Sequence, residues 1–60
     1  MDQAIVMRGA NARAAGISVF DNPFLKAANC PAATGGMIAE WLAKERAWDF
    51  GWQMEDAVRA

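Results

Sequence analysis

Apolar and polar residues follow a helical period in two long segments, one near each end of the chain. In the C-terminal segment, residues 37–59, apolar side chains recur every three or four positions, with Glu45 as a polar interruption. This spacing predicts an α-helix with one wide apolar stripe. Gly51 interrupts the pattern, and we expect another element to pack closely beside it. The stripe consists of Ile38, Trp41, Leu42, Glu45, Trp48 and Trp52.

The N-terminal segment, residues 2–15, predicts a helix with a face of small residues. Asp2 is suited to cap its start, and Gly16 is suited to end it with a positive φ. Small side chains let a helix backbone or a large ring approach closely, so we expect the rings of Trp48 and Trp52 to lie against this face. Its members, at spacings of four, three and four, are Ile5, Gly9, Ala12 and Gly16.

Residues 16–36 predict a connection that contains its own short helical turn. Asn22 precedes Pro23, and a capping side chain before proline is typical of a helix start, so we expect a turn over about residues 23–28. The Gly35-Gly36 pair predicts a loose hinge, because a phosphate-binding loop needs more glycines and a Lys-Ser or Lys-Thr pair. The apolar side chains that we expect to form a plug between the helices are Val19, Phe20, Phe24 and Leu25.

Composition supports an all-α fold of helix–linker–helix type, as a single small domain over residues 1–60. Alanine is abundant and β-branched residues are few, which favours helix over strand. A chain this short buries only about 60% of its unfolded surface. Its stability therefore comes either from efficient helix packing or from oligomerisation or a partner.

Two residue types that are common in enzyme sites, histidine and tyrosine, are absent. Without them the usual general acid–base arrangements lose their main residues, and a zinc site is not expected from one cysteine and no histidine. Cys30 is the one cysteine, so it forms no intrachain disulfide. We expect it to be an ordinary reduced thiol; the alternative is a reactive or partner-linking one. The sequence thus predicts a protein that is not an enzyme and needs no cofactor or metal.

Charge and hydropathy narrow the classes of partner. The net charge is −1, and neither half of the chain forms the basic patch that drives non-specific nucleic-acid binding. Arg8 and Arg13 lie off the small-residue face and are expected to be solvated. No apolar run approaches the roughly 20 residues of a membrane span, and the N-terminus lacks the pattern of a signal peptide. These features predict a cytoplasmic protein with no membrane partner.

Two groups of residues together resemble the ribosome modulation factor family. The first runs from Arg8-Gly9 to Asn22-Pro23-Phe24, and the second is Trp48-x-x-Gly51-Trp52. The resemblance implies a helix–linker–helix protein that binds the small ribosomal subunit and promotes inactive ribosome dimers in slow growth. The wider grouping includes short phage-encoded and plasmid-encoded proteins. The matched positions that we expect to define the fold are Gly9, Ala12, Gly16, Asn22, Pro23, Phe24, Trp48, Gly51 and Trp52.

We therefore expect a small regulatory protein that binds a host protein and that a phage could encode. The alternative is a ribosome-binding hibernation factor that contacts the small subunit and inhibits translation. A homo-oligomer is a further option. Exposed aromatic residues suit the first function, and basic residues on the first helix and the connection suit the second. The candidate partner-binding residues are Arg8, Arg13, Phe20, Lys26, Trp41 and Lys44.

Overall fold

The computed structural model describes all 60 residues and is helical throughout, with no strands. The two long helices are α1 (Gln3–Ala14) and α3 (Ile38–Arg59), which confirms the predicted helix–linker–helix fold. The linker between them consists of short helical turns, namely η1 (Val19–Asp21), η2 (Pro23–Leu25), η3 (Ala27–Asn29) and α2 (Pro31–Thr34). None of the helices has the length and apolar character needed to cross a bilayer.

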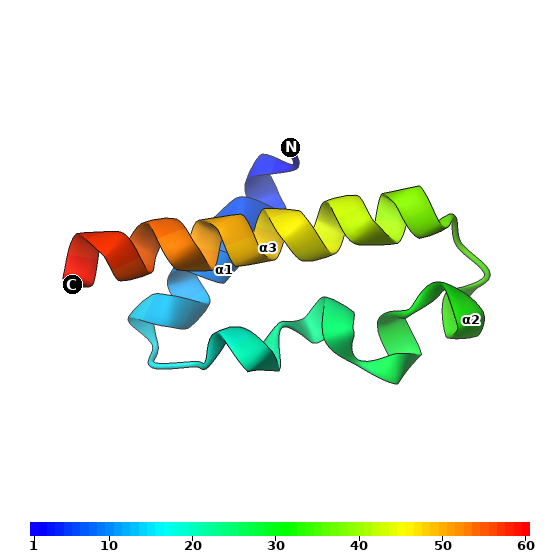
Figure 1. Cartoon of the computed structure of the whole chain (residues 1–60), viewed down its shortest axis with the longest axis horizontal. Helices are drawn as coiled ribbons and strands as arrows, with labels where there is room; N and C mark the ends of the chain where they lie inside the picture. The colour runs from blue at the N-terminus through cyan, green and yellow to red at the C-terminus, as the bar shows by residue number, and fades with distance from the viewer.

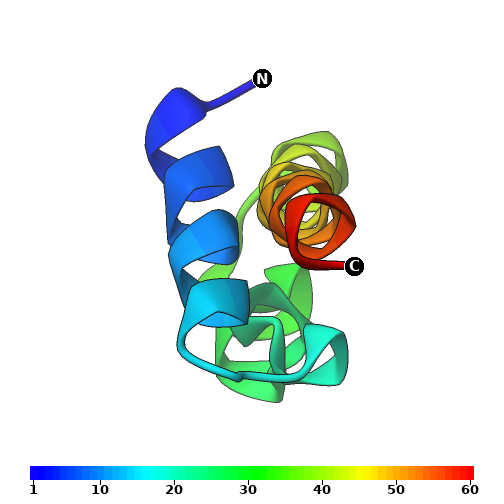
Figure 2. The same ribbon diagram turned by 90° about the vertical axis from the view of Figure 1, so that its left-hand side faces the viewer.

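The chain turns back on itself so that the linker accompanies α3. Figure 1 shows the linker running beneath α3 in the opposite direction, while α1 crosses behind α3. Figure 2, a view along α3, shows α1 and α3 side by side with the linker below both. The linker therefore contacts the protein's main helices along one side and faces solvent along the other.

Both ends of α1 have the predicted caps. One carboxylate oxygen of Asp2 accepts hydrogen bonds from the backbone N–H groups of Ala4 and Ile5, at 2.9 and 3.3 Å. At the C-terminal end Gly16 has φ = 82°, and its N–H donates to the carbonyl of Arg13. The N–H of Ile17 donates to the carbonyl of Ala12, which completes a Schellman motif.

Two glycines bring the backbones of α1 and α3 into direct contact. A Cβ atom at Gly51 would overlap the carbonyl group of Val6, which confirms the close approach predicted there. A Cβ atom at Gly9 would overlap the carbonyl of Trp48. The main chain of α3 at Trp48 therefore meets Gly9 directly, and Trp48 belongs to the buried core together with Ala12.

Gly16 does not belong to the helix contact, although its spacing suggested so. Nothing lies within 4 Å of the position of a Cβ atom at Gly16, and its role is to end α1. Near this point the indole Nε1 of Trp52 donates a hydrogen bond to the carbonyl of Ile17 at 2.7 Å. Trp48 is buried, with 3% of its surface exposed, whereas Trp52 is only half-buried.

The hydrophobic core is small and centred on the helix crossing. It contains Ile5, Ala12, Ala47 and Trp48, with Val6, Val19, Phe24 and Trp52 packed around it. The predicted stripe on α3 extends too far toward the N-terminal end of that helix. Ile38 is 66% exposed because α1 crosses α3 near Gly51, away from the first turns of α3. Ala47, which the stripe omitted, is completely buried.

The linker differs from its prediction in three respects. The turn expected over residues 23–28 is two separate turns, because Lys26 has an extended backbone conformation with ψ = 141°. Gly35 has the left-handed conformation and ends α2, a short helix that the sequence did not predict. In the expected apolar plug, Val19 and Phe24 pack on the core, but Phe20 and Leu25 are exposed.

Candidate interaction site

The linker is held against α3 by the side chain of Asn22. This residue is 2% exposed and is the one buried polar side chain of the protein. Its Nδ2 donates to the carbonyl of Glu45 at 3.0 Å, and its Oδ1 accepts from the N–H of Phe24 at 3.0 Å. The same amide therefore caps η2, as the sequence predicted, and fixes the position of this turn along α3.

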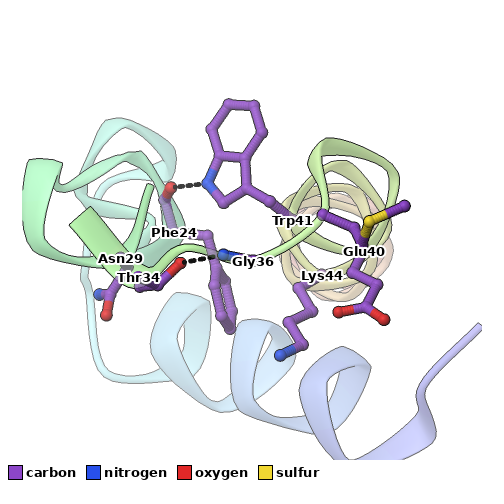
Figure 3. Close-up of a pocket in the computed structure, with 8 residues that line it drawn as sticks. Phe24, Asn29, Thr34, Gly36, Glu40, Trp41 and Lys44 are labelled. Carbon is purple, nitrogen blue, oxygen red and sulfur yellow. Dashed lines mark hydrogen bonds between the residues drawn. The ribbon is translucent and has the colours of Figure 1, made fainter. Parts of the chain in front are cut away.

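A second tie joins the linker to the N-terminal half of α3. The indole Nε1 of Trp41 donates to the carbonyl of Phe24 at 2.6 Å, as Figure 3 shows. Trp41 is half-buried, so part of its ring serves the fold and part faces solvent. The first hydrogen bond ends on the carbonyl of Glu45 and the second on that of Phe24. Two grooves lie between the linker and α3, and Trp41 lines one of them while Asn22 lines the other.

The first groove, here the Trp41 groove, has a volume of about 160 Å³. Figure 3 shows the ring of Phe24 and the side chain of Lys44 extending toward α1 from opposite sides of this groove. Glu40 contributes a carboxylate, so the lining carries both signs of charge. The groove is lined by Phe24, Asn29, Thr34, Gly36, Met37, Glu40, Trp41 and Lys44.

Two cationic side chains meet around Phe24. The guanidinium carbon of Arg8 lies 6.0 Å from the centre of the Phe24 ring, at the outer limit of a cation–π contact. Lys44 lines the same groove as this ring. Phe24 therefore lies near two of the candidate partner-binding residues, Arg8 from α1 and Lys44 from α3.

The second groove, here the Phe20 groove, has a volume of about 410 Å³ and differs in charge. Its linker side is apolar and its α3 side carries two carboxylates, while no lysine or arginine lines it. Phe20 is 85% exposed at its edge, the largest exposed fraction of any large apolar residue here. The groove is lined by Val19, Phe20, Asn22, Leu25, Glu45, Asp49 and Gln53.

Arg13 and Lys26 lie outside both grooves. Arg13 forms an ion pair with Asp56 at 2.8 Å, and its guanidinium lies 5.6 Å from the centre of the Trp52 ring. The expectation that Arg13 is solvated is therefore wrong, because it links α1 to α3. Lys26 is exposed on the linker, and its carbonyl accepts a hydrogen bond from the thiol of Cys30 at 3.3 Å.

The acidic side of the Phe20 groove was not among the predicted site residues. The sequence pattern placed Glu45 in the stripe of α3 as a polar interruption, and Asp49 was assigned no role. The available signal was the spacing of Glu45, Asp49 and Gln53 at four-residue intervals, which places them on one face of α3. Which segment lies opposite that face depends on the path of the linker, and the sequence did not indicate that path.

No cluster of three or more potential metal ligands occurs in the structure. Comparisons of the chain with protein-family models, curated proteins and solved structures found no match. The geometry itself defines the candidate site as two shallow grooves on one side of a small helical protein. One groove is lined by mixed charges and the other by apolar and acidic groups.

Proposed function

We propose that this chain is a small regulatory protein without catalytic activity, and that it acts in the cytoplasm by binding a protein partner through its linker. The observation that carries the proposal is the exposure of Phe20, of which 85% faces solvent. A cytoplasmic setting accords with its single free thiol, Cys30, since thiols stay reduced there.

The backbone that carries Phe20 is held in place by hydrogen bonds. The hydroxyl of Ser18 accepts from the N–H of Phe20 at 3.1 Å, and the carbonyl of Ser18 accepts from the N–H of Asp21 at 3.0 Å. Asn22 then fixes the chain to α3. An aromatic ring on a pre-ordered backbone loses little conformational entropy on binding, and such rings are common hot spots of protein interfaces.

The side chain of Phe20 is large enough to contribute substantially to the free energy of binding. Complete burial of a phenylalanine contributes about 1.5–3 kcal/mol from apolar area alone. Leu25 is also exposed and lines the same groove, so a partner would cover both side chains together. This combination favours a folded or folding protein segment as the ligand, because such segments offer apolar side chains of matching size.

A capture experiment tests the proposal. Tagged wild-type protein, Phe20→Ala and Phe50→Ala are compared in extracts of the source cells by quantitative mass spectrometry. Phe50 is the matched control, since it is 47% exposed on α3 and lies outside both grooves. We expect one dominant protein to be captured by wild type and Phe50→Ala and lost with Phe20→Ala. Equal capture by all three would contradict the proposal, provided that circular dichroism shows the same helical content.

Ribosome binding is a second candidate, supported by the resemblance to the ribosome modulation factor family. The placement of Arg8 and Lys44 around Phe24 favours it, because cations beside an aromatic ring suit contact with RNA. Sedimentation with small ribosomal subunits at stepwise increasing salt separates the candidates. Binding that falls steeply with salt supports ribosome contact, and absence of binding at every salt concentration removes it.

A further inference from the structure

We propose that the Phe20 groove binds a basic amphipathic segment of a protein, with an apolar side chain against the linker and lysine or arginine against α3. The inference rests on the proposed function and names the chemistry of the partner.

The walls of the groove differ in the way that an amphipathic ligand requires. The linker wall presents Phe20 and Leu25, both exposed, and the α3 wall presents Glu45 and Asp49. Asn22 lies buried between them with both ends of its amide hydrogen-bonded, so the floor offers no free polar group. A ligand is therefore selected by its apolar contact on one side and its charge on the other.

The length of the α3 wall fits a short helical segment. Glu45 and Gln53 are eight positions apart, which corresponds to about 12 Å at 1.5 Å per residue. In Figure 1 the linker runs beneath α3 over this stretch, so the apolar wall follows the polar one. A helix of two to three turns would place side chains along the whole groove, in the manner of helix-in-groove recognition.

The charges of this wall are free for a partner. The two ion pairs of the protein join Arg13 to Asp56 and Arg59 to Glu55, and neither involves the groove. The one side-chain hydrogen bond of Asp49 is from the amide of Gln53, at 3.5 Å. Arg46 follows Glu45 in the sequence but is exposed and does not line the groove.

The negative charge of the α3 wall favours some classes of partner over others. Nucleic acids and anionic membrane surfaces are repelled by an acidic wall, because each carries dense negative charge. A basic protein segment is attracted, and complementary charge mainly raises the rate of association and fixes the register. The apolar wall adds the contact that retains the segment.

A peptide titration followed by two-dimensional NMR of the ¹⁵N-labelled protein tests the inference. The probe is a synthetic helical peptide of leucine and lysine with one apolar face; its controls are a scrambled peptide of the same composition and a version with glutamate in place of lysine. We expect the probe to shift the amide signals of residues 19–25 and 45–53 and to bind more tightly than either control. Shifts centred elsewhere, or equal binding of the glutamate version, would overturn the inference.

Neutralising the acidic wall supplies the matched variant. Glu45→Gln with Asp49→Asn leaves both backbone carbonyls and the Asn22 hydrogen bond in place. The control, Asp2→Asn with Glu55→Gln, changes the net charge equally outside both grooves, and asparagine can still cap α1. We expect the first pair of substitutions to lower the affinity for the probe peptide by about tenfold or more, as the loss of close charge pairs does in interfaces. The control pair is expected to change this affinity little. Equal affinities for both variants would overturn the inference.

The same variants separate this inference from the proposed function. A captured partner that depends on Phe20 but binds Glu45→Gln/Asp49→Asn as tightly as wild type would support the proposed function. The same result would contradict the inference that the partner binds through a basic segment. When the captured partner is lost with this variant and retained by the Asp2→Asn/Glu55→Gln control, both the proposed function and the inference are supported. When no partner is captured at all, the proposed function fails together with the inference that rests on it.

Discussion

At the scale of single residues, the small side chain of Asn22 determines how the linker is attached to α3. Its amide satisfies the backbone N–H of Phe24 within the linker and the backbone carbonyl of Glu45 on α3, which lies 23 positions from Asn22 in the sequence. A buried side chain with both ends bonded specifies one geometry, since leaving either group without a partner costs free energy. The exposure of Phe20, two residues earlier, depends on this fixed geometry.

Asn22→Ala is expected to destabilise the protein by about 1–3 kcal/mol, because it leaves buried backbone groups without partners. Asn29→Ala is a suitable control, since Asn29 is exposed and its side chain makes one hydrogen bond, to the carbonyl of Pro23 at 2.7 Å. Urea unfolding followed by circular dichroism measures both. Unchanged stability of Asn22→Ala would show that this amide does not hold the linker.

At the scale of secondary-structure elements, the crossing of α1 and α3 depends on two glycines within helices. Each glycine normally weakens a helix by about 1 kcal/mol relative to alanine. Here Gly9 and Gly51 let the main chain of one helix lie directly against the other. The packing of the elements therefore outweighs local helix propensity at these two positions.

Gly51→Ala is therefore expected to destabilise the fold, contrary to its effect in an isolated helix. The added methyl would overlap the backbone of Val6, which cannot rotate away as a side chain can. Overpacking of this kind costs about 1–3 kcal/mol. Gly36→Ala is the control, because only the hydroxyl of Thr34 lies near its Cβ position. A melting temperature above that of the wild type for Gly51→Ala would contradict the close crossing.

At the scale of the whole molecule, the protein is thin and its core is small. Its extents are 37 × 20 × 13 Å, and seven of 60 residues are buried. Small domains have little surplus stability, so a few large side chains carry most of it. Trp48 is the largest member of the core, and its neighbours at the crossing cannot move to fill its place.

Trp48→Ala is expected to cost about 3–5 kcal/mol, enough to unfold a protein of this size. Phe50→Ala removes a neighbouring ring that is half-exposed, and we expect a much smaller effect. Trp52→Ala should fall between them, because it loses one hydrogen bond and the contact with Arg13. Melting curves compare the three variants. Retention of full helical content and melting temperature by Trp48→Ala would refute this core.

The features that the sequence predicted correctly are those that depend on residues close together in the sequence. The caps at Asp2 and Gly16 depend on residues within one turn, and the close approach at Gly51 follows from an otherwise costly glycine in a helix. The Glu55–Arg59 ion pair likewise joins residues only four positions apart, which is the spacing of neighbours on a helix face.

The features that the sequence missed depend on how distant segments meet. The pairing of Arg13 with Asp56 spans 43 positions, and the exposure of Phe20 depends on the path of the linker. Ala47 is buried because the helices cross beside it, and alanine alone gives no sign of this. For the same reason, the sequence alone did not indicate that Glu45 and Asp49 form one side of the Phe20 groove.

The central claim is that the linker binds a protein at Phe20, and crosslinking in living cells tests it most directly. A photo-crosslinking phenylalanine analogue replaces Phe20 in one variant and Phe50 in another. We expect irradiation to join position 20 to one dominant protein and position 50 to none. An adduct with ribosomal RNA at position 20, or the same protein adduct at both positions, would contradict the claim.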